Sequence, residues 1–387
     1  MNTLKFSSHD RVLILAPHPD DESLATGGLI QRAVKAGAKV RVALVTDGDN
    51  NPWPQRFVER RLKIRRKDRA RWGRRRRKEA LAALARLGLD RKCTRFLGLP
   101  DQGITGLLLG ADEKALAAIR AEIKEWRPTL LVAPSSGDAH PDHSAIFVLA
   151  QLALAQLAET KQTPPRVLRY VIHAPRRLGE RRRVTLHLSD EEIQSKREAI
   201  LCHDSQMALS RKRFTGYARE QEVFYADAPT TATSSHHAVA SAELARGALQ
   251  LHLRLRSSRA RFAGWTLLLA IESNTNGSIR WALPMPSSSR CVELEDAQTG
   301  EPARLATVRI RGRTARVSVP IAPLQPIRQI FVKLERRRFL YDEAGWREVP
   351  VEPNPAVATN IASPSEKKTR SLSQQARAAA RTILALF

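Results

Sequence analysis

The chain has 387 residues, of which 42% are hydrophobic and 27% charged, so it is long enough to bury more than one core. We find no apolar run of about 18 residues, which argues against a transmembrane helix, and no signal-peptide pattern at the start. The three scattered cysteines argue against a disulfide framework and favour a reducing compartment such as the cytoplasm.

The formal net charge of +26 is large. Such a field attracts nucleic acid, acidic lipid headgroups or a phosphorylated substrate, although an arginine-rich composition without any such partner would account for it equally well. The basic residues are densest between Arg56 and Lys78. This segment predicts either a surface for anions, such as a membrane face, or a solvated basic helix.

The first part of the chain alternates between predicted strands and helices. Residues 11–16 form an apolar run typical of a buried parallel strand, followed by a helix over 22–36 and a second strand over 39–46. The pattern continues with a helix over 77–87, a strand over 94–97, a helix over 113–126, a strand over 129–133, a helix over 144–158 and a strand over 166–173. The alternation predicts a Rossmann-like α/β domain over residues 1–227, with a mostly parallel sheet and helices on both faces.

The pattern changes after this domain. Residues 228–246 begin with a stretch rich in Thr, Ser, Ala and Pro and are predicted to be a linker. Short alternating apolar runs over 247–349 predict a β-rich, sandwich-like accessory domain. Its three tryptophans are candidates for sugar stacking, but core positions are the commoner case. Residues 350–387 are predicted to be a flexible tail with a short amphipathic helix.

Two clusters of His and Asp residues follow two of the predicted strands. His18, Asp20 and Asp21 come directly after the first strand, and His140, Asp142 and His143 follow the strand that ends at Ala133. The carboxyl ends of parallel strands share one edge of a sheet, so we expect the clusters to meet. Two imidazoles and a carboxylate with an open position have the composition of a catalytic zinc site. In the simpler interpretation of either cluster alone, these are turn residues and Asp20 caps the next helix.

These motifs resemble the PIG-L or LmbE-like deacetylase family, whose signatures are a Pro/Ala-His-Pro-Asp-Asp-Glu loop and a His-Pro-Asp-His loop. The resemblance covers about residues 8–227. Further matches occur in family order at Val45–Gly48, at Arg76 with Glu79, at Phe96–Gly98, at Pro100-Asp101, at Lys196, and at His203–Gln206.

The resemblance implies a role for each residue of the two loops. His18, Asp21 and His143 would bind one Zn²⁺ ion per chain, or another divalent metal. Asp20 would act as the general base. His140, protonated through a pairing with Asp142, would stabilise charge or donate a proton.

The substrate contacts predicted from the resemblance are Arg76, Asp47 and His203. For Arg76 the alternative is an ion pair with Glu79 on the same helix. The predicted function is a zinc-dependent N-deacetylase, a hydrolase of linear amide C–N bonds. Its substrate would be an N-acetylglucosamine-type sugar or glycolipid, lipid- or phosphate-linked, from cell-envelope biosynthesis.

We expect a cytoplasmic protein. A second possible location is the anionic inner face of the membrane, as a peripheral protein. Two alternatives stay open. A non-heme iron enzyme uses the same two histidines and one carboxylate, but on a β-rich scaffold. A basic protein that binds nucleic acid or membrane around a vestigial site would explain the charge, but we expect no specific nucleic acid because no recognition motif is evident.

Overall fold

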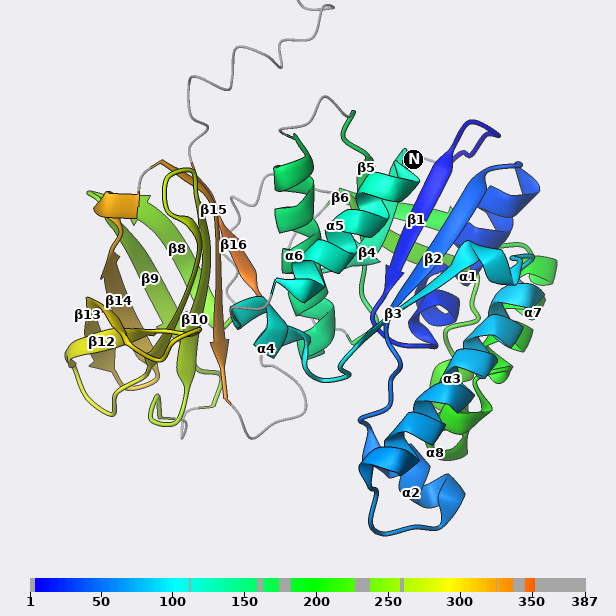
Figure 1. Ribbon diagram of the computed structural model, residues 1–387, viewed down its shortest axis with the longest axis horizontal. Helices are drawn as coiled ribbons and strands as arrows, with labels where there is room; N and C mark the ends of the chain where they lie inside the picture. The colour runs from blue at the N-terminus through cyan, green and yellow to red at the C-terminus, as the bar shows by residue number, and fades with distance from the viewer. Residues whose placement is uncertain are drawn as a thin grey trace, which may run out of the picture. The chain divides into compact units, whose positions relative to one another are not determined.

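The computed structural model describes residues 4–110, 113–158, 163–173, 182–226, 237–257, 261–324, 326–336 and 345–351 (Figure 1). The described residues up to Pro350 belong to one compact unit. The predicted helix in the C-terminal tail lies outside the described residues.

A seven-stranded sheet organises the first part of the chain, in the order β3-β2-β1-β4-β5-β7-β6. Its strands are β1 (Arg11–Ala16), β2 (Lys39–Thr46), β3 (Thr94–Leu99), β4 (Leu130–Pro134), β5 (Arg166–Tyr170), β6 (Arg182–His187) and β7 (Gln221–Ala226). The first five are parallel, whereas β7 pairs antiparallel with both β5 and β6. The predicted mostly parallel sheet is confirmed.

Helices cover both faces of this sheet because successive strand residues point to opposite sides. Val12 and Ile14 pack towards α1 (Asp21–Lys35), α3 (Arg66–Arg86) and α7 (Asp190–Leu201). Leu13 and Leu15 pack towards α4 (Ile104–Leu109), α5 (Lys114–Trp126) and α6 (Pro141–Ala158). The short helix α2 (Pro52–Glu59) packs against α8 (Asp204–Thr215), and η1 (Arg91–Cys93) precedes β3.

Helix α3 begins at Arg66, eleven residues before the helix that the sequence predicts. The prediction followed the alanine-rich apolar end of the helix, because the arginine-rich start shows little apolar periodicity. The helix nevertheless begins early because Asp68 accepts a hydrogen bond from the backbone of Arg65 at 3.0 Å. Trp72 and Arg76, four residues apart, then form its buried face.

A second sheet of nine antiparallel strands follows, in the order β16-β15-β10-β11-β12-β13-β14-β9-β8. Its elements are β8 (Val239–Ala245), β9 (Ala248–Arg254), β10 (Thr266–Ser273), β11 (Gly277–Pro284), β12 (Arg290–Asp296), β13 (Pro302–Arg311), β14 (Thr314–Pro320), η2 (Ala322–Leu324), β15 (Ile327–Glu335) and β16 (Arg347–Val349). Arg347 joins the two edge strands, because its Nη1 donates to the carbonyls of Val239 and Ala240. The predicted β-rich region is confirmed.

Two details of the C-terminal prediction change. Strand β8 occupies 239–245, so the predicted linker over 228–246 is too long, and residues 227–236 lie outside the described part. Trp265, Trp281 and Trp346 are at most 4% exposed and belong to the core, as the commoner alternative had it. Within the described residues, none of the helices combines the length and the apolar character that crossing a bilayer requires.

Candidate metal centre and active site

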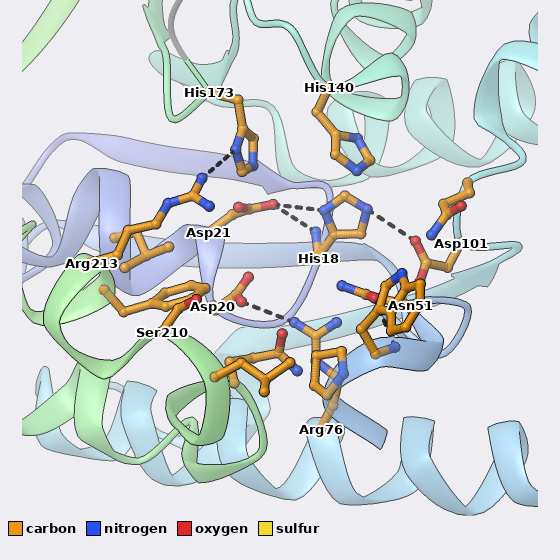
Figure 2. A pocket seen from close by; sticks show the side chains of 17 residues that line it. His18, Asp20, Asp21, Asn51, Arg76, Asp101, His140, His173, Ser210 and Arg213 are labelled. Carbon is orange, nitrogen blue, oxygen red and sulfur yellow. Dashed lines mark hydrogen bonds and ion pairs between the residues drawn. The ribbon is translucent and has the colours of Figure 1, made fainter. Parts of the chain in front are cut away.

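The candidate site lies where the strand order of the first sheet reverses, between β1 and β4, which are parallel neighbours. Ligands of open α/β sheets bind at the carboxyl ends of the strands at such a point. The loop after β1 carries His18, Asp20 and Asp21, and the loop after β4 leads to His140 and His143. The two sequence clusters therefore meet at one edge of the sheet, as predicted (Figure 2).

Three potential ligand atoms from these loops lie close together. Nδ1 of His18 and Nε2 of His143 each lie 3.2 Å from Oδ2 of Asp21, and the two nitrogens are 3.4 Å apart. Zinc bound tetrahedrally at about 2.0–2.1 Å keeps its ligand atoms roughly 3.3 Å from one another, so this spacing fits a single metal ion. All three side chains are buried. They are the three that the sequence predicts as ligands.

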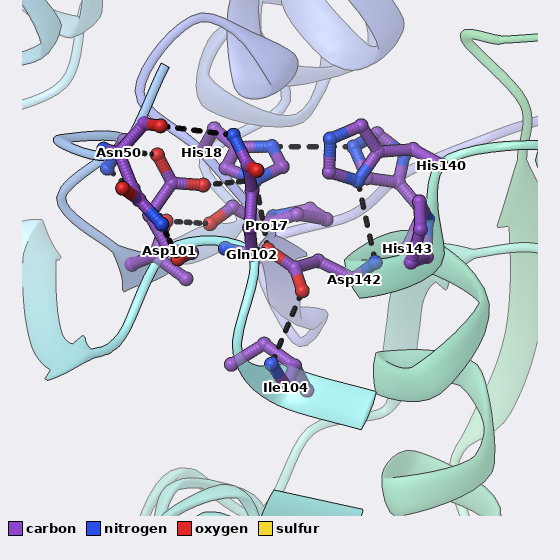
Figure 3. A network of polar contacts seen from close by, with 12 residues as sticks. Pro17, His18, Asn50, Asp101, Gln102, Ile104, His140, Asp142 and His143 are labelled. Atoms are coloured by element: carbon purple, nitrogen blue, oxygen red, sulfur yellow. Dashed lines mark hydrogen bonds and ion pairs between the residues drawn. The ribbon is translucent and has the colours of Figure 1, made fainter. Parts of the chain in front are cut away.

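A carboxylate holds each imidazole from its far side. Nε2 of His18 lies 3.2 Å from Oδ1 of Asp101 and 3.3 Å from Oδ2 of Asp142 (Figure 3). Nδ1 of His143 lies 3.1 Å from Oδ2 of Asp138. A proton on each of these nitrogens leaves a lone pair on the opposite nitrogen, towards the other ligand atoms. The carboxylates thus select the tautomers that can bind a metal.

Backbone amides from neighbouring strands fix these carboxylates. Asp142 accepts hydrogen bonds from the amides of Gln102 at 2.7 Å and Ile104 at 3.1 Å, which follow β3. Asp138 accepts one from the amide of Ile172 at 2.8 Å, which follows β5. The orientation of both imidazoles therefore depends on loops beside the two motifs.

The carboxylates of the cluster favour the positively charged form of both imidazoles. Burial lowers the pKa of His143, but the charges of Asp138 and Asp21 outweigh it and raise that pKa to about 10. Burial likewise opposes the charge of His18, yet its hydrogen bonds to Asp101 and other carboxylates hold its pKa well above the ordinary value. Burial would raise the pKa of Asp21, but the two imidazoles hold it well below its usual range. A metal ion would satisfy the same carboxylates.

Asp20 occupies a strained turn between the sheet and α1. Its φ of 134° lies in a region that residues other than glycine rarely adopt, at a typical cost of about 1–3 kcal/mol. Its amide donates to Oε2 of Glu22 at 2.9 Å, and its carboxylate accepts a hydrogen bond from Nη2 of Arg76 at 3.0 Å. The side chain makes no capping bond to α1. Asp20 therefore occupies the N-cap position of α1, as in the simpler interpretation, but its side chain pairs with Arg76 and does not cap the helix.

The environment of Asp20 suits proton exchange near neutral pH. Burial raises its pKa, the charge of Arg76 lowers it, and the balance is a pKa of about 6. Arg76 is itself buried and also donates to the carbonyls of Gly48 and Pro19. It thereby ties α3 to the loops after β1 and β2 and keeps a positive charge beside Asp20.

The position of His140 differs from the prediction. The carboxylate of Asp142 faces His18, and Asp142 instead donates its backbone amide to Nδ1 of His140 at 3.2 Å. Burial, followed by the charges of His18 and His143, holds the pKa of His140 well below its usual value. His140 is therefore neutral, with its proton on Nε2, and not protonated through Asp142. The reason is that Gln102 and Ile104 hold that carboxylate on the other side.

The three predicted substrate contacts fall in different places. Arg76 lines the pocket, and its ion pair is with Asp20, whereas Glu79 pairs with the neighbouring Arg75. Asp47 forms an ion pair with Arg77 and does not belong to the pocket lining. The alternative interpretation of Arg76, an ion pair with Glu79, is therefore wrong.

His203 is buried behind the pocket. Its Nε2 lies 3.0 Å from Oε1 of Glu22, and Nδ1 has no hydrogen-bond partner among the described residues. Since Glu22 also accepts the amide of Asp20, His203 supports the strained turn through Glu22.

The pocket above the cluster is lined mainly by the loops after β1, β2, β3, β4 and β5, together with α2, α3 and α8 (Figure 2). Its lining comprises His18, Asp20, Asp21, Leu24, Asn51, Trp53, Pro54, Arg76, Asp101, Gln102, His140, His173, Gln206, Leu209, Ser210, Arg213 and Phe214.

Sequence reasoning assigned no role to three residues of this site. Asp101 and Asp138 hold the two imidazoles, and His173 lines the pocket with its Nδ1 accepting from Arg213 at 3.2 Å. One signal was available: Asp101 and His173 each come just after a strand of the parallel sheet, at the edge where both motifs lie.

Comparison with known proteins gives an independent indication. The family model PIG-L: GlcNAc-PI de-N-acetylase matches residues 13–154. The 1D-myo-inositol 2-acetamido-2-deoxy-alpha-D-glucopyranoside deacetylase of Mycolicibacterium vanbaalenii is 35% identical over 173 residues, which are 40% of this chain and 57% of the relative. The enzyme of the same name from Mycobacterium avium is 36% identical over 152 residues, 34% of this chain and 47% of the relative.

The chain thus spans about half the length of the curated relatives that it matches. Among solved structures, the N,N'-diacetylchitobiose deacetylase from Pyrococcus horikoshii is similar at 20% identity and a TM-score of 0.43, over 56% of this chain and 83% of that one. The match of the family model includes both loops of the candidate site. Residues 13–154 of this chain are a PIG-L family domain.

Proposed function

We propose that this protein is a metal-dependent N-deacetylase that hydrolyses the acetamide of an N-acetylated amino sugar. The observation that supports it most is the ligand trio of His18, Asp21 and His143, with mutual distances of 3.2–3.4 Å at the base of a pocket. We further propose Zn²⁺ as the metal, one ion per chain. This donor set would hold it with an open position for water and substrate.

Bound there, zinc would lower the pKa of a coordinated water and polarise the acetyl carbonyl. The remaining chemistry belongs to the side chains around it. Asp20, with a pKa of about 6, is ionised at neutral pH and can accept the proton of the attacking water. Arg76 keeps this carboxylate in place by its ion pair at 3.0 Å.

We assign His140 to the oxygen of the scissile acetyl group. It lines the pocket beside His18, with ring centroids 4.7 Å apart. A neutral imidazole whose Nδ1 already accepts a backbone hydrogen bond presents an N–H at Nε2, which can donate to a developing oxyanion. Asp142 contributes indirectly, by orienting His18.

For the substrate we propose an N-acetylglucosamine unit, lipid- or phosphate-linked, in cell-envelope biosynthesis. The description of the family model names GlcNAc-PI as the substrate, and the names of the curated relatives contain a 2-acetamido-2-deoxy-glucopyranoside. Arg76 is the best placed of the predicted substrate contacts, because it is the one that lines the pocket. Asp47 and His203 lie outside the pocket lining, so they would support the site through their pairs with Arg77 and Glu22 and would not touch the substrate.

The test is acetate release from the purified protein with a panel of N-acetylated sugars and sugar lipids, before and after treatment with a chelator. We expect acetate from at least one N-acetylglucosaminide, loss of activity with chelator and recovery with Zn²⁺. Metal analysis of the untreated protein distinguishes zinc from the ferrous alternative. Acetate release that persists without metal would contradict the proposal.

A further inference from the structure

The rim of the pocket exposes large apolar side chains. Five large hydrophobic residues are well exposed among the described residues, and four of them lie on α2, the loop after it and α8. They are Trp53 at 63% exposure, Phe57 at 62%, Leu62 at 91% and Leu209 at 47%. Scattered single residues of this kind are ordinary, but a group on adjoining elements indicates an interaction site.

This apolar group adjoins the candidate active site. Trp53 and Leu209 line the same pocket as Asp20, so they form part of its mouth. Trp53 and Phe57 are four residues apart on α2 and therefore share one face of that helix. Figure 1 shows α2, α8 and the beginning of α3 together at one end of the α/β region. We call α2 together with residues 60–67 the rim segment.

The rim segment and the start of α3 carry a dense positive charge. Residues 56–78 contain fourteen Arg or Lys and two acidic residues. Several arginines at the inner side of this run pair with nearby carboxylates. In contrast, Lys63, Arg66 and Lys67 are exposed and form no ion pair among the described residues. Their charge faces solvent next to Leu62.

We propose that the rim segment docks on an anionic lipid bilayer, so that the pocket receives an acetylated amino sugar carried by a membrane amphiphile. The inference rests on the proposed function. Cations beside exposed Trp, Phe and Leu are the composition of surfaces that lie in the membrane interface. The cations are attracted to acidic headgroups, and the apolar side chains enter the acyl boundary. Nucleic acid would use the cations but would give Phe57 and Leu62 no apolar environment.

The experiment measures binding of the full chain to phosphatidylcholine vesicles with and without one-third phosphatidylglycerol, by co-sedimentation at several salt concentrations. We expect salt-sensitive binding to the anionic vesicles. The variant Lys63→Gln/Arg66→Gln/Lys67→Gln should bind them on the order of 100-fold more weakly. Its matched control, Arg309→Gln/Arg311→Gln/Arg316→Gln, removes three exposed charges from β13 and β14 and should bind as the unaltered protein does.

The apolar part of the surface needs its own test. Phe57→Ala/Leu62→Ala should weaken binding roughly 10-fold, whereas Leu305→Ala on β13, which is also exposed, should not. Trp53 is the most exposed tryptophan of the chain, so brominated lipids should quench its fluorescence. The change Trp53→Phe should abolish most of that quenching.

Three results would overturn the docking proposal. The first two are equal binding to neutral and anionic vesicles, and equal losses of binding in the rim and control variants. The third is a protein that does not bind vesicles but binds polyuridylate, with an affinity that Phe57→Ala/Leu62→Ala leaves unchanged. Acetate release from a water-soluble N-acetylglucosaminide separates this outcome from failure of the proposed function. The variants Lys63→Gln/Arg66→Gln/Lys67→Gln and Phe57→Ala/Leu62→Ala, whose residues lie outside the pocket lining, should retain that soluble activity. Acetate release without vesicle binding would contradict docking alone, whereas no acetate from any substrate would contradict the deacetylase.

Discussion

The two sheets of this protein bury charged groups in different ways. In the nine-stranded sheet two buried cations each pair with one carboxylate, Arg280 with Glu272 at 2.6 Å and Lys333 with the half-buried Glu335 at 2.9 Å. At the carboxyl edge of the seven-stranded sheet, buried carboxylates and imidazoles instead form one continuous cluster. Every group of potential metal ligands within the described residues belongs to this cluster.

The difference separates burial that pairs opposite charges from burial that gathers several ionisable groups at one edge of a sheet. A buried pair of opposite charges is neutral and needs nothing more. A cluster with an excess of carboxylates around two imidazoles favours a cation, and its groups are held in place by backbone amides from several strands. The following predictions test this contrast, from the largest expected effect on activity to the smallest.

Removal of a ligand should have the largest effect. His143→Ala deletes one of the three proposed ligand atoms, so the protein should lose its metal during dialysis, and acetate release should fall to background. Metal content by mass spectrometry and acetate release would be measured on the same sample. His252→Ala, which deletes a half-buried imidazole of the second sheet, is the matched control and should change neither. Full metal content in His143→Ala would show that the trio is not the site.

The carboxylate behind His18 should have a smaller effect. Asp101→Asn removes the charge that faces Nε2 of His18 at 3.2 Å, and losses of this kind typically weaken metal binding by about 10–100-fold. Competition with a fluorescent chelator measures the affinity independently of activity. Asp47→Asn, which lies outside the pocket lining, should retain the affinity of the unaltered protein. If both variants bind the metal with equal affinity, Asp101 does not orient His18 for metal binding.

The third prediction concerns pH. The pKa of Asp20 is raised by burial to about 6, so kcat/KM should fall as the pH drops through that value and the base becomes protonated. Arg76→Gln removes the charge that lowers this pKa, so the acid limb should move to higher pH by roughly one unit. Arg75→Gln, one position away and paired with Glu79, should leave the limb in place. A shift to lower pH in Arg76→Gln would contradict the assignment.

The smallest effect on activity is expected in the apolar core. Ile14 in β1 and Ile330 in β15 are both completely buried. Ile14→Val and Ile330→Val should each lower the free energy of unfolding by about 0.5–1.5 kcal/mol while kcat stays unchanged. Denaturant unfolding and acetate release measure the two quantities. A loss of kcat in Ile330→Val would show that the second sheet takes part in the chemistry.

Much of the α/β fold, and the convergence of His18, Asp21 and His143, could be predicted because the signals are local. An apolar strand followed directly by His18 and Asp21 indicates both the strand and the chemistry at its end. Helix α2 was missed because its sequence contains two prolines and lacks a clear apolar period, although Asn51 accepts the amide of Trp53 as a helix cap does. The antiparallel strands β6 and β7 were missed as well.

The supporting contacts could not be predicted from spacing. Asp101 reaches His18 from the end of β3, and Asp142 turns to His18 because the amides of Gln102 and Ile104 hold it there. These are tertiary contacts between loops distant in sequence. For the same reason the predicted pairing of the Asp142 carboxylate with His140 is wrong: both residues lie at the site, but this carboxylate faces His18.

The central claim is that one bound metal and the carboxylate of Asp20 together hydrolyse an acetamide. The most direct measurement compares metal content and acetate release in the unaltered protein and in Asp20→Asn. The account predicts one metal ion per chain in both, and a kcat reduced by about 10²–10⁴-fold in Asp20→Asn. Full activity of Asp20→Asn with its metal bound would contradict it.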